Sequence, residues 1–348
     1  MKPSVTLIGD HIENLANART MVHAAAMFGS TCFFHGSPEQ RYGVPHGDGL
    51  QTITRTELAA AHAPLVACDN TDGAVDVYGF RLPGGPRPAL IVGNERRGVS
   101  KEVTRLARCA VEIPMVSRRV TTLNVAAAAA VALYYVGRGA GGRTAVHRAP
   151  ERRRPELLLI GGQDHVELGS TIRSAGAFGW RSLFLEDRGE VWFGSDRGPR
   201  TEGRAAARRA KNPIRLVPVG ADQRYPFDEA IVVGSLRNGV PISRVRLANG
   251  PRQLIVLADE GQVDLDREDW SRLARHVHTA HLDLPADDFV YHYRLTASIA
   301  LAEIARQIGR AAAPGPGVPR RGLRYDLALT LVPEAEGEVV YLEDLEDY

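Results

Sequence analysis

Short apolar runs alternate along the chain with segments in which apolar residues recur every three or four positions. The runs are typical of buried strands, and the longer spacing is typical of amphipathic helices. Over residues 1–136 the pattern predicts strands in SVTLIG, STCFFH, LVACD, ALIVG and VEIPM, and helices over 14–28 and in TRTELAAAH, SKEVTRLARCA and NVAAAAAVALYYV. This alternation predicts an α/β fold built on a mainly parallel sheet.

The pattern stops at a segment rich in Gly, Arg and Pro and then starts again. It next predicts strands in ELLLIGG, SLFLE, AIVVGS and QLIVLAD, helices over 168–178 and in REDWSRLARHV and YRLTASIALAEIARQIG, and a tail hairpin from YDLALTLV and EVVYLED. We therefore predict a first domain over 1–137, a basic linker over 138–155, a second domain over 156–312 and an acidic tail over 313–348.

The second domain repeats the first. RTMVHAAAMFG (19–29) matches GSTIRSAGAFG (169–179), with His23 in the earlier segment where the later one has Arg173. LIVGNERRGVS matches LIVLADEGQVD, and TLNVAAAAAVAL matches RLTASIALAEI. Self-similarity over a long period indicates an internal duplication.

Charge is distributed unevenly, although the formal net charge is only +2. Basic residues cluster over 138–154 and 197–215, and the segment 334–348 is strongly acidic. Each cluster is either a solvated face or, for the basic ones, a surface for phosphate groups. The sequence has no apolar run of about 18 residues that would span a membrane. The first strand starts too early for a signal peptide, and three scattered cysteines favour a reducing cytoplasm.

The segment ALIVGNERRGVS predicts a strand that ends at Gly93, a turn with Gly98, and Ser100 as the cap of the next helix. Val99 stands where a P-loop needs lysine, and no GxGxxG follows a strand. The loop is therefore either a ligand crevice at the carboxyl edge of a sheet or a structural turn. No Cys/His set has zinc spacing, and we interpret HVHTAH (276–281) as surface or core, so no metal is expected.

Three segments together resemble a known family. NLANARTMVHAAAMFG, ALIVGNERRGVS and EIPMVSRRVTTLNVAAAAAVALY are similar to the three motifs of the SPOUT superfamily, in its TrmH-like branch of 2′-O-ribose RNA methyltransferases. The resemblance covers 1–136 and, more weakly, 156–309. It implies two tandem trefoil-knotted α/β domains that form an intramolecular pseudo-dimer, and S-adenosylmethionine as cofactor.

The resemblance also implies which residues hold the cofactor. Carried over position by position, these are Gly93, Asn94, Gly98, Ile113, Met115, Leu123 and Asn124, with Glu95 and Asn124 shaping the site around the methyl donor. Asn124 has an alternative role as a helix cap, and Glu95 as an acceptor that organises its loop. The second domain has Ala258, Asp259, Val263 and Thr296 at the matching positions, so we expect its cofactor site to be dead.

The first motif shows the reverse. The family's catalytic arginine is absent at His23 and present at Arg173, whereas the asparagines before it, Asn14 and Asn17, are kept only in the first domain. We therefore expect one composite site, with Arg173, Asn17, Glu95 and Asn124 as catalytic residues. The alternatives are that Arg173 is an ordinary exposed helical arginine, or that Arg19, one turn before His23, partly replaces the arginine.

The resemblance implies rRNA or tRNA as substrate. Phosphate contacts are expected from arginines in the first helix, the linker and the insertion, namely Arg19, Arg152, Arg153, Arg204 and Arg208. The duplication predicts a monomer that acts as a pseudo-dimer. Two other functions fit the same residues: an RNA-binding pseudoenzyme, favoured by His23, and a methyltransferase for a substrate other than RNA, favoured by the acidic tail.

Overall fold

Two parallel β-sheets form the framework of the computed structural model, which describes residues 5–36, 50–115, 122–138, 154–161, 164–194, 214–235, 239–245, 247, 252–286, 288–308 and 338–340. The first sheet has seven strands in the order β3-β2-β1-β6-β4-β7-β5. Their bounds are β1 Thr6–Asp10, β2 Cys32–His35, β3 Gln51–Thr52, β4 Leu65–Cys68, β5 Val75–Asp76, β6 Ala89–Val92 and β7 Cys109–Glu112. The α/β prediction is confirmed.

The second sheet repeats this order. It runs β10-β9-β8-β13-β11-β14-β12, and an eighth strand, β15, pairs antiparallel with β10. The bounds are β8 Glu156–Gly161, β9 Ser182–Asp187, β10 Ile214–Pro218, β11 Phe227–Gly234, β12 Val240–Pro241, β13 Gln253–Ala258, β14 Ala274–His281 and β15 Glu338–Val340. An identical order of seven parallel strands supports the internal duplication.

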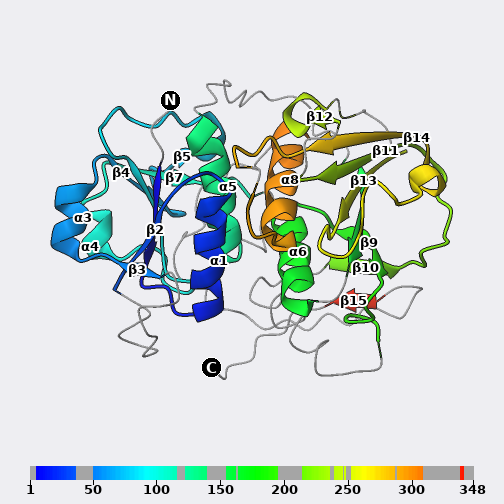
Figure 1. Ribbon diagram of the computed structural model, residues 1–348, viewed down its shortest axis with the longest axis horizontal. Helices are drawn as coiled ribbons and strands as arrows, with labels where there is room; N and C mark the ends of the chain where they lie inside the picture. The colour runs from blue at the N-terminus through cyan, green and yellow to red at the C-terminus, as the bar shows by residue number, and fades with distance from the viewer. Residues whose placement is uncertain are drawn as a thin grey trace.

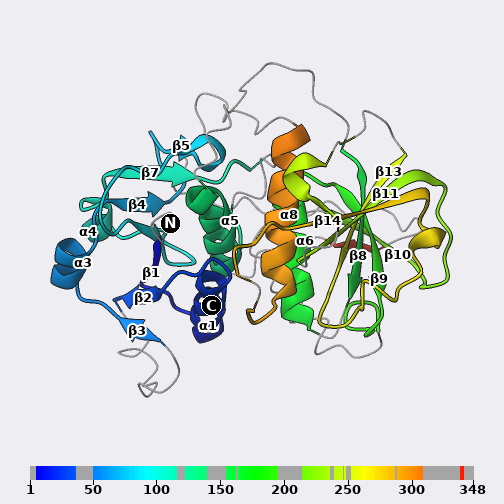
Figure 2. The ribbon, with the colours of Figure 1, turned by 45° about the horizontal axis from the view of Figure 1, so that its top comes forward.

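Four helices lie between the two sheets (Figures 1 and 2). They are α1 (Leu15–Ala26) and α5 (Val125–Arg138) from the first half, and α6 (His165–Ala177) and α8 (Tyr293–Ile308) from the second. Alanines along α5 allow it to pack closely on α1 and α8, and the largest apolar cluster runs from the first sheet through all four helices into the second. The two halves therefore share one core.

The face of the first sheet that points away from the four central helices has its own apolar cluster and its own helices. Helices α3 (Arg55–Ala61) and α4 (Lys101–Thr104) cover the first sheet over a second apolar cluster that includes Ile8, Leu58 and Val103. Single-turn 3-10 helices follow β5 (Val77–Gly79), follow β12 (Ile242–Arg244) and precede β14 (Trp270–Arg272). No helix among the described residues is long and apolar enough to cross a membrane.

One predicted helix is wrong. The segment REDWSRLARHV forms the short turn Trp270–Arg272 and then enters β14, which pairs with β11 over eight residues that include three histidines. Strand pairing overrides the local helical spacing here. The matching strand β7 likewise takes the end of the predicted helix SKEVTRLARCA, which stops at Thr104. Of the tail hairpin, only β15 lies within the described residues.

Candidate active site

The loop after β6 is closed by its own backbone. Asn94 and Gly98 exchange two hydrogen bonds of 3.0 Å, and Gly98 has a φ of +70°, which favours glycine. A Cβ on Gly93 would lie 2.1 Å from the Gly98 carbonyl carbon and the Val99 nitrogen. Asn94 Oδ1 accepts from the Arg96 and Arg97 backbone N–H groups, and its Nδ2 donates to His11 O. Both glycines are thus required by the tight turn itself.

A chain of hydrogen bonds joins the three motifs of the first half. Glu95 Oε1 accepts from Asn17 Nδ2 at 2.9 Å, and Asn17 Oδ1 accepts from Asn124 Nδ2 at 3.0 Å. Glu95 also accepts from the backbone N–H groups of Glu13 and Asn14 at the start of α1. Glu95 therefore organises the loops, as the alternative interpretation expects, and the same bonds bring Asn17, Glu95 and Asn124 together.

Both asparagines at helix starts act as caps. Asn14 Oδ1 accepts from the Ala16 and Asn17 N–H groups of α1, and Asn124 Oδ1 accepts from the N–H groups of Ala126 and Ala127 in α5. The apolar residues predicted around the cofactor lie at the two ends of the intervening loop: Ile113 and Leu123 are buried and Met115 is half-buried. Residues 116–121, between them, lie outside the described residues.

Arg173 extends from α6 to the first half of the chain. Its Nη2 donates to Thr122 Oγ1 at 2.6 Å, and its Nε donates to Thr122 O at 3.2 Å. Thr122 stands two residues before Asn124. The Arg173 side chain is only 7 % exposed, so the interpretation as an ordinary exposed arginine is wrong. The fold thus brings a buried guanidinium from the second half against the third motif of the first.

The matching position in the first half carries no comparable cation. His23 Nδ1 lies 2.8 Å from His292 Nε2, and the two rings are stacked with centroids 5.0 Å apart. Burial lowers the pKa of His23, and the charge of His292 lowers that pKa further. At neutral pH the His23 ring is therefore less charged than an exposed histidine, unlike arginine, which keeps its charge.

In the second half, a small cavity lies beside Ala258 and Glu260, which match Gly93 and Glu95 of the first half. This cavity of about 10 Å³, close to the room that one water needs, lies among the ends of β11 and β13 and the start of α8. Tyr293 donates to Leu257 O at 2.8 Å, and Tyr291 accepts from the Glu260 N–H at 3.0 Å. Both hydroxyl groups therefore hydrogen-bond to the backbone at the end of β13 and directly after it.

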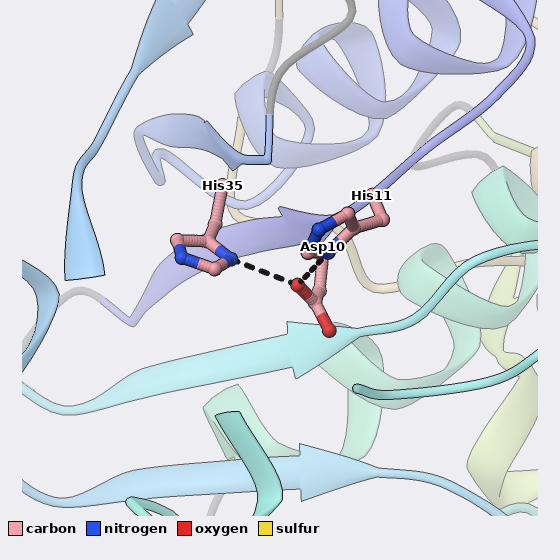
Figure 3. Close-up of side chains that lie close together, drawn as sticks. All are labelled: Asp10, His11 and His35. Carbon is pink, nitrogen blue, oxygen red and sulfur yellow. Dashed lines mark hydrogen bonds and ion pairs between the residues drawn. The ribbon is translucent and has the colours of Figure 1, made fainter. Parts of the chain in front are cut away.

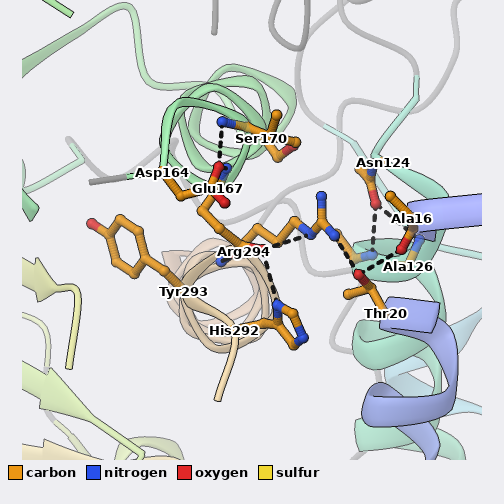
Figure 4. Close-up of polar contacts among 12 residues, drawn as sticks. Ala16, Thr20, Asn124, Ala126, Asp164, Glu167, Ser170, His292, Tyr293 and Arg294 are labelled. Atoms are coloured by element: carbon orange, nitrogen blue, oxygen red, sulfur yellow. Dashed lines mark hydrogen bonds and ion pairs between the residues drawn. The ribbon is translucent and has the colours of Figure 1, made fainter. Parts of the chain in front are cut away.

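Carboxylates replace amides at three positions of the second half. Asp164, Glu167 and Asp259 stand where the first half has Asn14, Asn17 and Asn94. Arg294 lies among them: its Nε is 3.2 Å from Glu167 Oε1, and its Nη2 donates across the helix layer to Thr20 on α1 (Figure 4). His292 Nδ1 also contacts Glu167, at 2.9 Å. Sequence comparison missed Arg294, because a Thr-to-Arg replacement does not show which half the side chain contacts.

Of these three carboxylates, Asp259 has a clearly raised pKa. Burial raises its pKa to about 6, and the nearby charges of Glu167 and Asp164 act in the same direction against the hydrogen bond from the Gly261 N–H. Because the folded-state pKa exceeds the unfolded one, folding favours the protonated form. The free energy of unfolding therefore falls as the pH rises from about 4 to about 6, and it stays lower above that range.

We expect Asp259→Asn to stabilise the protein at pH 7 by roughly 1–3 kcal/mol and to have no effect below about pH 4. The amide oxygen can still accept the Gly261 N–H bond, which is 3.1 Å long. Urea denaturation at both pH values measures the difference, with the exposed Asp288→Asn as the matched control. Equal stabilisation at both pH values would show that charge is not the cause.

Of the five arginines predicted to contact RNA phosphates, only Arg19 lies within the described residues. Arg19 is exposed on α1. Arg152, Arg153, Arg204 and Arg208 lie outside the described residues.

One known protein family matches the part of the chain that carries the second and third motifs. Residues 46–134, about a quarter of the chain, match the model of the SpoU rRNA Methylase family. That range contains the Gly93–Ser100 loop and Asn124. The first half therefore carries a domain of the SPOUT superfamily, and within it the domain is of the SpoU, or TrmH-like, type.

Solved structures are similar over part of the chain. One concerns 2-OH methylation of C/U34 on tRNA (26 % identity, 40 % of this chain and 97 % of that one, TM-score 0.31). Another is a TrmH/SpoU tRNA modifying enzyme of A. aeolicus (20 %, 40 % and 76 %, TM-score 0.33). A third is the SpoU methyltransferase AviRb from Streptomyces viridochromogenes with AdoMet (23 %, 40 % and 58 %, TM-score 0.32). No curated protein matches the chain.

Proposed function

We propose that the protein is an S-adenosylmethionine-dependent RNA methyltransferase with one composite active site per chain. The first half holds the cofactor, the second half supplies Arg173, and the substrate is a ribose 2′-OH of rRNA or tRNA. The observation that carries the proposal is the contact of the buried Arg173 guanidinium with Thr122, next to Asn124. The family match supports the methyltransferase class.

The residues of the first half fit this cofactor. Adenosine sites combine apolar walls with a few precisely placed backbone groups. The buried Ile113 and Leu123 supply apolar walls, and the loop closed between Asn94 and Gly98 supplies backbone groups. Residues that would hold the cofactor are Gly93, Asn94, Gly98, Ile113, Met115, Leu123 and Asn124. When bound, the cofactor supplies an electrophilic methyl group.

Arg173 positions the RNA in this proposal. Its pKa makes it a poor base, but its planar fork binds two phosphate oxygens at once. The hydrogen bonds to Thr122 hold the Arg173 guanidinium beside the third motif. A substrate held in a reactive geometry by such a group reacts faster, even without proton transfer to the arginine. The hydrogen bonds that join Asn17 to Glu95 and to Asn124 hold the three motifs together around the reacting atoms. Arg19, exposed on α1, contributes a further phosphate contact.

The arrangement of the halves supports an intramolecular pseudo-dimer of two knotted domains. The strand orders are the same, and α1 and α5 face α6 and α8 across one core. A chain that already buries this surface internally has no further need of a second copy. We therefore propose that the protein is a monomer.

Calorimetry with S-adenosylmethionine tests the cofactor site. We expect one site per chain, and at least about tenfold weaker binding for Gly93→Ala, because its Cβ would overlap the Gly98 and Val99 backbone. Ala258→Gly, the same exchange reversed in the second half, is the matched control and should bind like the unmodified chain. Two sites per chain would refute the composite model. Absence of binding, with RNA binding kept, would favour the pseudoenzyme.

A further inference from the structure

Three metal-ligating side chains meet at the carboxyl edge of the first sheet. Asp10 ends β1, His11 follows it, and His35 ends β2, whose register pairs Asp10 with His35. Asp10 Oδ1 lies 2.7 Å from His11 Nδ1 and 2.9 Å from His35 Nδ1 (Figure 3). Among the described residues this is the only group of three such side chains with all its donor atoms within 4.8 Å of one another.

We propose that Asp10, His11 and His35 bind a divalent transition-metal ion of the zinc class, through Asp10 Oδ1 and the two Nδ1 atoms. Ligands about 2.1 Å from a tetrahedral ion lie about 3.4 Å from each other. The two Oδ1–Nδ1 distances of 2.7 and 2.9 Å are shorter than that spacing, so the side chains would move apart slightly as the ion enters. Each imidazole would then carry its proton on Nε2. Two imidazoles and one carboxylate are a donor set that suits zinc, iron, nickel or copper.

Surrounding hydrogen bonds orient the donors as a metal site requires. The Ser100 N–H donates to Asp10 Oδ2 at 2.6 Å, which fixes the carboxylate and directs Oδ1 toward the histidines. Oδ1 therefore faces both imidazoles.

His11 adopts a backbone conformation that side chains rarely take. Its φ is +55°, and its ring packs on Gly36, where a Cβ would lie 2.4 Å from the ring. The His11 N–H donates to His35 O at 2.8 Å, and His11 O accepts from Asn94 Nδ2 at 2.7 Å. Histidine adopts a positive φ more readily than most residues other than glycine, and these two hydrogen bonds hold His11 in that conformation beside His35.

The duplicated half is an internal control. Strand registers place Ile160 and Gly161 at the end of β8, and Glu186 on β9, at the positions of Asp10, His11 and His35. Ile160 is fully buried, and Glu186 is paired with Arg272 at 2.8 Å. The fold therefore does not need these polar groups at the strand ends. They occur in the half that keeps the Gly93–Ser100 loop, to which Asp10 and His11 are hydrogen-bonded.

The site is open to solvent on one side. The side chain of His11 is 47 % exposed, whereas those of Asp10 and His35 are buried. Three protein ligands leave a fourth position for water, as in zinc sites with an open coordination position.

Titration of the tag-free chain with Co(II), followed by its visible absorption bands and by displacement with Zn(II), tests the proposal. We expect one ion per chain and affinity at least about tenfold weaker in both His11→Asn and His35→Gln. Asparagine is chosen because it tolerates a positive φ. Zn(II) should also raise the melting temperature of the unmodified chain but not of His11→Asn.

The control is a variant with His276→Asn and His278→Asn, which removes exposed histidines of β14. It should bind Co(II) like the unmodified chain. Loss of binding in this variant alone, or binding unchanged in His11→Asn and His35→Gln, would show an adventitious ion only and overturn the proposal. These outcomes are independent of methyl transfer, because no RNA or S-adenosylmethionine is present.

Discussion

Arg173→Ala is expected to lower methyl transfer to RNA by on the order of a hundredfold to a thousandfold, while S-adenosylmethionine binding stays nearly intact. The guanidinium belongs to the second half and donates two hydrogen bonds to Thr122, outside the Gly93–Ser100 loop, so we expect its loss to leave that loop in place. Transfer of labelled methyl groups into total RNA, with mass spectrometry of the modified nucleoside, measures the effect. The same measurement identifies the methylated atom.

Three further variants make this experiment decisive. Arg275→Ala removes an exposed arginine on β14 and should leave transfer unchanged. Arg173→Lys keeps the charge but loses the fork, so intermediate activity is expected. If His23→Ala were inactive and Arg173→Ala active, the assignment of the arginine to the second half would be reversed. A modified base in place of a modified ribose would contradict the proposed substrate atom.

Arg294→Ala is expected to lower the free energy of unfolding by roughly 3–5 kcal/mol, because it leaves the Glu167 carboxylate, whose side chain is only 13 % exposed, without its arginine. Arg294 is only 4 % exposed, and it joins Glu167 on α6 to Thr20 on α1. After truncation, Glu167 keeps only the His292 ring and the Arg294 backbone N–H as partners. Urea denaturation followed by circular dichroism measures the loss.

Arg267→Ala is the matched control for this ion pair. Arg267 is 3.3 Å from Asp264, but its side chain is 87 % exposed, so a change of less than about 1 kcal/mol is expected. Adding Glu167→Gln to Arg294→Ala should recover part of the loss, since the unpaired charge is then gone. Equal losses in the Arg294 and Arg267 variants would mean that burial does not strengthen this pair.

The sequence contains the repeat but not all of its consequences. Matching motifs identified Gly93, Asn124 and Arg173, and the fold brings Arg173 to the third motif as the composite model expects. Tyr291 and Tyr293 hydrogen-bond to the end of β13, yet nothing in YHYRLTAS shows that their hydroxyl groups reach it. Such contacts depend on where a helix starts relative to a sheet, which residue spacing does not determine.

Residue spacing also did not predict strand β14 or the meeting of Asp10, His11 and His35 at the carboxyl ends of β1 and β2. In REDWSRLARHV the apolar residues recur at helical intervals, but the neighbouring strand β11 offers a full ladder of hydrogen bonds. The repeat itself held the correcting signal, because VEIPM of the first half occupies the same place in its sheet. Asp10, His11 and His35 meet only because β1 and β2 are adjacent and parallel, a pairing that takes the topology to establish.

Because the two halves share one core, substitutions in the second half have different consequences at its strand ends and in its helices. At its strand ends and helix starts the second half differs in sequence from the first: Asp164, Glu167 and Asp259 stand where the first half has asparagines. In α6 and α8 the same freedom is missing, because their apolar faces complete the interior of the first half. Substitutions in the apolar faces of α6 and α8 would therefore disturb the interior of the first half, although these helices belong to the second.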